Sequence, residues 1–296
     1  MMKRILALLL LLATLLCLCS CSNTGSVSTF SIRFIDVGQG DAALIECDGH
    51  YMLIDGGEKT AGEKVYNVLE EQRIQHLDIL AVSHLHTDHY GGLIKALSYA
   101  SAIDLTICNS EHSDTGTFRS FEHELATNGT RITLPSNGDK YELGSATVEV
   151  VDVCSNEDND SLVLLITYGN TRFLFPGDIQ RKGQLRVTEV LREKYNNFSG
   201  LSLIKMPHHG AYNDVHGFFE NNLNGLFQVY DPSYFVISVG KGNKYGHPHQ
   251  EALDVIENIL VRSKGLDWNS HVFRTDIQGD IIVKSNGKQL SVETTR

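Results

Sequence analysis

The sequence is poor in features that mark several classes of protein. Beyond the first 21 residues its only cysteines are Cys47, Cys108 and Cys154. An odd, small set of this kind does not form the disulfide framework of a small secreted protein, so we expect buried free thiols. We find no internal repeat and no long hydrophobic run after the first twenty residues. With 296 residues, the chain is therefore expected to form one compact catalytic domain rather than a repeat array or a channel.

Basic residues are also scarce relative to acidic ones. The chain carries a net charge of −11 at pH 7. An acidic body repels phosphate backbones unless a local basic patch compensates. The densest basic cluster lies between Arg181 and Lys194, on what we expect to be a surface helix. Nucleic acid is therefore a disfavoured partner, although small phosphoesters are not excluded.

The N-terminus has the pattern of an export signal. Lys3 and Arg4 precede an apolar run from Ile5 to Leu18, which is too short to span a membrane comfortably. We expect residues 1–20 to be a lipoprotein signal peptide.

The end of this segment, Leu18-Cys19-Ser20-Cys21, resembles a bacterial lipobox in which Cys21 is lipidated. Cys17 or Cys19 could compete for the lipid, and an ordinary cleaved signal peptide is the alternative. Residues 21–29 read as a flexible tether, and residues 30–296 as the folded domain. The expected location is lipid-anchored on the outer face of a bacterial membrane.

The segment Ser83–Gly92 carries the strongest chemical pattern. It follows the apolar run Leu77–Val82, which favours a buried strand. Imidazole and carboxylate groups are typical ligands of zinc and similar divalent ions. Too many such groups occur here for one ion, so we interpret the segment as half of a two-metal site. Its candidate ligands are His84, His86, Asp88 and His89. The alternative is a solvated histidine-rich loop that binds nothing.

Further candidates follow other predicted strands. Asp55 precedes two glycines, and is either a turn residue or a carboxylate that orients a ligand histidine. Asp178 ends a hairpin and can bridge two cations, one oxygen to each, or act as a plain turn residue. His208 and His209 follow the strand that begins at Leu203. One is the remaining ligand of the second ion and the other a proton carrier or an outer-shell donor, and the sequence does not choose between them.

A glycine-containing loop near the C-terminus offers groups that could hold an anionic substrate. They are Lys241, Asn243, Lys244 and Tyr245, followed by His247. The alternative is an ordinary polar surface connection.

The remaining pattern predicts an alternation of strands and helices. Helices are expected over residues 60–72, 93–97, 114–128 and 250–261. Strands are expected over residues 31–37, 42–46, 51–54, 103–108, 131–134, 141–143, 146–153, 162–168, 171–175, 203–207 and 234–240.

These motifs together resemble the metallo-β-lactamase superfamily, and within it the extracytoplasmic hydrolase domain of ComEC-type DNA-uptake proteins. The resemblance covers residues 30–261. It is carried by Phe34–Asp41, Leu53–Gly57, His84-x-His86-x-Asp88-His89, Asn159-x-Ser161-Leu162-Val163, Gly177-Asp178, His208-His209-Gly210 and Tyr245–Pro248.

The resemblance implies an α+β fold, a four-layer αββα sandwich with two divalent ions at one edge. His84 and His86 would bind the first ion and Asp88 and His89 the second. Asp178 would bridge the ions, and the His208-His209 pair would complete the second.

Many members of the superfamily place a third histidine on the first ion, where this chain has Asn159-Asp160-Ser161. Asn159 and Ser161 thus become outer-shell or substrate candidates. Zinc is the expected metal, with manganese as the alternative.

Two such ions can supply hydroxide at neutral pH, and their histidine ligands must be neutral, so activity should fall in acid. His247 or the nonligand member of the His208-His209 pair could protonate the leaving group. Lys205 and Lys241 are candidate charge stabilisers.

The expected function is a surface-anchored phosphodiesterase that acts on nucleic acid or on a phosphorylcholine or cell-wall ester. The acidic charge favours the smaller ester. The alternatives are a lactonase or β-lactamase type of hydrolase, against which the His-His-Gly and Gly-His-Pro patterns speak, and a noncatalytic metal-binding lipoprotein. DNA import is not implied, and no oligomeric state is predicted.

Overall fold

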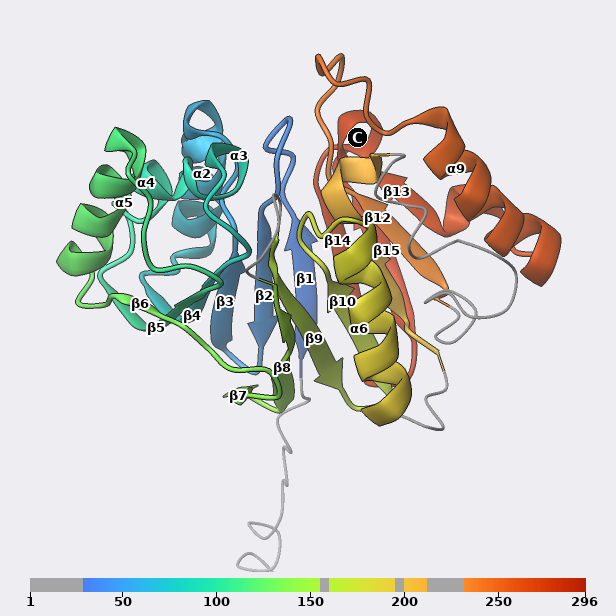
Figure 1. Cartoon of the computed structure of the whole chain (residues 1–296), viewed down its shortest axis with the longest axis horizontal. Coiled ribbons are helices and arrows are strands. Elements are labelled where there is room, and N and C mark those ends of the chain that lie inside the picture. The colour runs from blue at the N-terminus through green and yellow to red at the C-terminus, as the bar shows by residue number, and fades with distance from the viewer. Residues whose placement is uncertain (1–28, 155–159, 195–199, 212–231) are drawn as a thin grey trace, which may run out of the picture.

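The computed structural model describes residues 29–154, 160–194, 200–211 and 232–296. Two β-sheets pack face to face, and helices cover the outer face of each sheet (Figure 1). This is the four-layer αββα arrangement expected of a metallo-β-lactamase fold, so the predicted fold class is confirmed.

The first sheet has eight strands in the order β15-β14-β1-β2-β3-β4-β5-β6. Its β3, β4, β5 and β6 strands are parallel to one another, whereas the remaining pairs are antiparallel. The strands are β1 (Phe30–Phe34), β2 (Ala43–Cys47), β3 (His50–Ile54), β4 (His76–Val82), β5 (Ala102–Cys108), β6 (Ile132–Thr133), β14 (Ile281–Ser285) and β15 (Leu290–Thr294).

The second sheet has seven strands in the order β13-β12-β11-β10-β9-β8-β7. The strands β7 to β10 form an antiparallel meander, and β10 to β13 are parallel. The strands are β7 (Lys140–Leu143), β8 (Ala146–Val153), β9 (Leu162–Tyr168), β10 (Thr171–Phe175), β11 (Leu203–Lys205), β12 (Tyr234–Ile237) and β13 (Val272–Arg274).

Apolar side chains fill the space between the sheets. Phe30 of β1 stacks on Phe173 of β10 at 4.9 Å between ring centroids, and Phe34 stacks on Phe175 at 5.6 Å. All four rings are buried. The β9–β10 hairpin is buried along nearly its whole length, as its continuous apolar pattern predicts.

The helices complete two further apolar layers. Against the first sheet pack α2 (Gly62–Gln72), α4 (Leu93–Ala96) and α5 (Gly116–Thr127), and against the second pack α6 (Arg181–Lys194) and α9 (Gln250–Glu257). Each presents apolar residues at helical spacing to its sheet, for example Val65, Val68 and Leu69 on α2. The short elements are η1 (Lys59–Ala61), α3 (Thr87–Tyr90), η2 (Pro207–Gly210), η3 (Asn258–Ser263), η4 (Trp268–Ser270) and α10 (Thr275–Gln278).

The predicted elements are present with small shifts at their ends, and two differences stand out. The helix predicted over residues 250–261 ends at Glu257 and continues as the π-helical η3. The strands β13, β14 and β15 were not predicted, although β14 pairs with β1 in the middle of the first sheet.

Cys47, Cys108 and Cys154 are buried and unpaired, as the sequence predicts. Within the described ranges, no helix has the length and apolar character needed to cross a bilayer. The predicted signal peptide and all but the last residue of the predicted tether lie outside those ranges.

Candidate metal centre

The candidate ligands gather where strands of both sheets end at one edge of the sandwich. The loop after β4 carries His84 to His89, Asp178 follows β10, and His208 and His209 follow β11. Backbone hydrogen bonds join these segments. Leu162 N donates to Ser83 O at 2.7 Å, and His208 N donates to Gly177 O at 3.2 Å.

Two glycines permit the close approach of these loops. Gly177 has a φ of +59°, and a Cβ there would lie 2.5 Å from the Cβ of Ser161. Gly40 has a φ of +130°, and its Cβ would lie 2.3 Å from the carbonyl oxygen of Asp88. Any larger residue at either position would push apart the loops that carry the candidate ligands.

Four side chains from three of these segments form one cluster: Asp88, His89, Asp178 and His209. One ligand atom from each lies within 4.8 Å of the others. Oδ2 of Asp178 is 3.2 Å from Nε2 of His89 and 3.4 Å from Nε2 of His209. Oδ2 of Asp88 is 3.6 Å from Nε2 of His209. A mixed set of imidazole and carboxylate donors is what zinc or manganese binds.

His89 is oriented from behind by a carboxylate and a hydroxyl. Oδ2 of Asp55 lies 2.9 Å from Nδ1 of His89 and accepts a hydrogen bond from the Ser83 hydroxyl at 2.7 Å. Oδ1 of Asp55 accepts from Ser83 N at 2.7 Å. Asp55 thus occupies the position of an orienting carboxylate, and its backbone has a positive φ of 57°. With Nδ1 engaged, Nε2 of His89 faces the cluster.

The ring of His209 is likewise oriented through its Nδ1 atom. Its Nδ1 donates to Ser238 O at 2.9 Å and lies 3.4 Å from Oδ1 of Asp41. His208 is placed differently, because its Nε2 is 3.9 Å from Oδ2 of Asp178 and its side chain is 24% exposed. The structure therefore puts His209 inside the cluster and His208 at its rim.

His84 and His86 lie beside the cluster, with ring centroids 4.5 Å apart. His84 is buried, and its Nδ1 lies 3.1 Å from Ser83 Oγ and 3.3 Å from Ser161 Oγ. His86 is exposed. The Ser161 hydroxyl also accepts a hydrogen bond from Asp178 N at 2.9 Å, so Ser161 joins the two halves of the site.

Several buried atoms of this site have no hydrogen-bond partner. They include Nε2 of His84 and Nε2 of His209. Buried polar atoms are rarely left unsatisfied, and both nitrogens belong to a metal-ligating residue type. The residues present therefore fit a divalent metal centre.

The charges of the cluster shift the pKa values of its members. Burial alone would lower the pKa of His209, but the carboxylates of Asp178 and Asp41 outweigh burial and raise it to about 9. The pKa of His89 is raised well above its ordinary value, because Asp178 and Asp55 outweigh burial. The pKa of His84 is lowered well below its ordinary value by burial and by the charge of His89.

The cluster opens into a cavity of about 230 Å³. Half of the residues that line it are histidines, and Asp178 lies at its base. The lining residues are Gln39, His86, Asp88, Asp178, His208, His209, Tyr245 and His247.

The loop from Gly240 to Pro248 forms one wall of this cavity. Oδ1 of Asn243 accepts from Tyr245 N at 3.1 Å and from His247 N at 3.0 Å, so Asn243 shapes the loop. The Tyr245 ring is 52% exposed and stacks on His247 at 5.6 Å. Lys241 is exposed and is not among the residues that line the cavity.

Other predicted site residues lie away from the cavity. Lys205 is buried beneath the cluster, where its ammonium group pairs with Asp41. Asn159 and Cys21 lie outside the described residues.

Sequence reasoning assigned no site role to Asp41, Ser83, Ser238 or Gln39. Asp41 had a signal, since it ends the glycine-containing segment Val37-Gly38-Gln39-Gly40-Asp41, which was used only for the family resemblance. Ser83 directly precedes the first ligand candidate. Ser238 contributes a backbone carbonyl, which any residue type could supply.

The family model of the metallo-beta-lactamase superfamily matches residues 35–216. The chain therefore belongs to the metallo-β-lactamase superfamily.

Within it, the chain is distantly related to competence proteins. It is 27% identical over 275 residues to ComE operon protein 3 of Bacillus subtilis, covering 84% of this chain and 32% of that protein. It is 24% identical over 245 residues to competence protein ComA of Neisseria gonorrhoeae, covering 82% and 30%. The chain thus spans about a third of the length of these relatives.

Solved structures share the fold at low identity. The metallo-beta-lactamase fold protein YhfI of Bacillus subtilis superposes with a TM-score of 0.54 at 11% identity, covering 86% of this chain and 100% of that one. The E377D mutant of the CmlA beta-hydroxylase gives 0.55 at 12% identity, covering 86% and 54%.

Proposed function

We propose that this protein is a binuclear metal-dependent phosphodiesterase. The observation that carries the proposal is the buried Asp88-His89-Asp178-His209 cluster, which opens into a histidine-lined cavity. His84 and His86 would hold one divalent ion and the cluster the other, with Asp178 between them. Zinc is the metal we propose first and manganese the alternative.

The charge of the loaded site is compatible with an anionic substrate. The carboxylates of Asp55, Asp88 and Asp178 contribute three negative charges, while Asp41 is balanced by Lys205. Two divalent ions and the hydroxide that they supply would therefore leave the loaded centre close to neutral. The carboxylates alone would repel a phosphodiester, and the metal ions remove that repulsion.

When bound, the two ions supply hydroxide at neutral pH and stabilise negative charge on the ester oxygens. Residues of the chain would orient the substrate and protonate the leaving group. The ring of His247 is neutral near pH 7, because burial and the nearby His209 and His208 lower its pKa to about 4. A neutral ring orients an ester oxygen by hydrogen bonding. We therefore propose His208, at the rim of the cavity, as the proton donor to the leaving group.

A small ester is favoured over duplex DNA. The net charge of −11 opposes a long polyanion, and a cavity of about 230 Å³ suits a headgroup or a single nucleotide. One of the relatives is named competence protein ComA, and we keep single-stranded DNA as the second substrate within the same reaction class.

The test compares substrates on one preparation. The purified full-length chain, stripped with chelator and supplied with zinc or manganese, is offered bis-p-nitrophenyl phosphate, p-nitrophenyl phosphorylcholine, labelled single-stranded DNA, a lactone and a β-lactam. Asp178→Ala is the inactive control. Metal-restored cleavage of a phosphodiester supports the proposal. Cleavage confined to the lactone or the β-lactam overturns the reaction class.

We further propose that the protein is exported and anchored through a lipid on Cys21. The support is the signal-like pattern of residues 1–20 and the lipobox-like residues before Cys21. Metabolic labelling with a radioactive fatty acid tests this. Label in the native chain that disappears in Cys21→Ala supports the anchor, whereas label that persists in Cys21→Ala or is absent from both contradicts it.

A further inference from the structure

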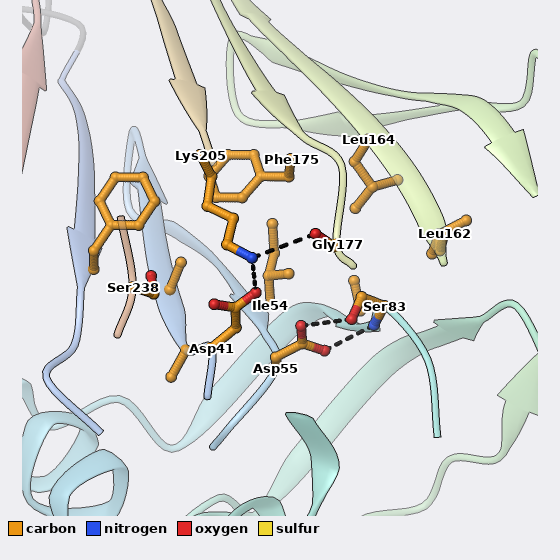
Figure 2. A pocket seen from close by; sticks show the side chains of 14 residues that line it. Asp41, Ile54, Asp55, Ser83, Leu162, Leu164, Phe175, Gly177, Lys205 and Ser238 are labelled. Carbon is orange, nitrogen blue, oxygen red and sulfur yellow. Dashed lines mark hydrogen bonds and ion pairs between the residues drawn. The ribbon is translucent and has the colours of Figure 1, made fainter. Parts of the chain in front are cut away.

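A buried ion pair lies directly beneath the candidate metal centre. Lys205, the last residue of β11, is 3% exposed, and Asp41 is 7% exposed. Figure 2 shows the Lys205 side chain reaching from β11 to the carboxylate of Asp41 and to the carbonyl of Gly177. The ammonium group of Lys205 is 3.6 Å from Oδ1 of Asp178.

The surroundings of this pair are unfavourable for charge. Phe34, Ile54, Leu164 and Phe175 line the same small space, whose volume of about 20 Å³ is roughly that of one water molecule (Figure 2). At most one water molecule fits beside the pair, so most of the hydration lost by the two charges is not replaced. Buried ion pairs are often no more stabilising than apolar side chains of similar size. A contribution to stability is thus a poor explanation for this pair.

The contacts of the pair point to a different role. Oδ2 of Asp178 faces the imidazoles of His89 and His209, while Oδ1 faces Lys205. Asp41 reaches the far side of the same two imidazoles, since its carboxylate lies 3.4 Å from Nδ1 of His209 and 3.8 Å from Nδ1 of His89. The pair therefore contacts three of the four members of the cluster.

We propose that Lys205 and Asp41 are positioning residues of the metal centre, an inference that rests on the proposed function. Lys205 holds Oδ1 of Asp178, so that Oδ2 is the oxygen offered to metal. The carbonyl of Ser238 accepts a hydrogen bond from Nδ1 of His209, and the carboxylate of Asp41, 3.4 Å away, favours that tautomer through its charge, so that Nε2 is the ligand atom. Neither residue contacts the substrate, because neither lines the cavity above the cluster.

If the pair has this role, substitutions in it should affect the melting temperature and the metal affinity differently. Lys205→Met and Asp41→Asn each leave one buried charge unpaired, so each lowers the melting temperature of the metal-free chain. The double variant Lys205→Met/Asp41→Asn removes both charges and recovers most of that loss. It still lacks both positioning contacts, so its zinc affinity stays about 10- to 100-fold weaker than that of the native chain.

The experiment measures two quantities on the full-length chain. The first is the melting temperature after chelation. The second is affinity for zinc and for cobalt, with the visible absorption of bound cobalt reporting ligand geometry. Glu149→Gln is the control, because Glu149 is a buried carboxylate paired with Lys194 on the α6 side of the second sheet. It should lower the melting temperature and leave metal affinity unchanged.

Weakened binding and an altered cobalt spectrum in the double variant support the inference. If the double variant binds both metals as the native chain does, the positioning role is wrong while the proposed function stands. If the native chain binds neither metal, the proposed function and this inference are both overturned.

Discussion

Binding of metal to the cluster should release protons, because two of its imidazoles are protonated in the metal-free protein. A pKa of about 9 leaves nearly every His209 ring protonated at pH 7.5. The pKa of His89 is also raised well above its ordinary value. Metal requires both imidazoles in the neutral form. His84 adds nothing, since its pKa is lowered and its ring is already neutral.

Loading the cluster with zinc at pH 7.5 is therefore expected to release about two protons from the imidazoles, and a further one where bound water becomes hydroxide. The two imidazole protons alone make the apparent affinity about 100-fold weaker for each pH unit below 7.5, which corresponds to about 2.7 kcal/mol. The metal affinity falls in acid because protons and metal compete for the same nitrogen atoms of His89 and His209.

Titration calorimetry in buffers of different ionisation enthalpy measures this number directly. The slope of the observed enthalpy against the buffer's ionisation enthalpy is the number of protons released. His247→Asn is the control, since that ring is already neutral with a pKa of about 4, and its slope should match the native one. A slope near zero for the native chain would refute the reasoning from His89 and His209.

Three further predictions concern stability. In the metal-free chain His209 has a folded-state pKa of about 9, above the unfolded value, so its stabilisation is complete below pH 6.5 and is lost as the pH rises through 9. Urea unfolding at pH 6.5 and pH 9.5 should differ by up to about 3 kcal/mol, and equal or higher stability at pH 9.5 contradicts this. Ser83→Ala removes the 2.7 Å hydrogen bond to Asp55 and should cost about 1–2 kcal/mol in urea unfolding. The exposed Ser98→Ala is its control, and equal losses would show that the buried contact adds nothing. Gly92→Ala would place a Cβ 2.0 Å from Gly56 O and should cost about 2–3 kcal/mol or more by the same assay. Gly116→Ala meets its nearest atom only at 3.7 Å and should stay within about 1 kcal/mol; a similarly small change in Gly92→Ala would show that the loops can separate.

The parts of the site that are local in sequence could be predicted from sequence. His84, His86, Asp88 and His89 lie within six positions after a strand whose apolar pattern marks it as buried. Their proximity follows from the chain itself.

The choice between His208 and His209 could not be predicted, because adjacent residues of the same type carry no distinguishing pattern. The backbone of η2 decides it. Both residues have positive φ, 46° and 55°, and this turn buries His209 while leaving His208 at the rim.

The Asp41–Lys205 pair was missed for a related reason. Asp41 lies in the loop between β1 and β2 of the first sheet and Lys205 on β11 of the second, far apart in sequence, so only the packing of the two sheets brings them together. The strand β15 was missed because it is at the sheet edge and none of its side chains is fully buried. Its sequence, Leu290-Ser291-Val292-Glu293-Thr294, does alternate, but with only two apolar residues the pattern is too short to mark a strand.

If divalent metal held by this cluster cleaves a phosphodiester, hydrolysis should follow metal binding. The most direct measurement is the rate of bis-p-nitrophenyl phosphate hydrolysis by the chelated full-length chain as zinc is added back. We expect turnover that rises with bound zinc in the native chain and is absent from Asp178→Ala at every zinc concentration. Equal rates in the two chains, or a native chain that binds zinc and never turns over, would contradict it.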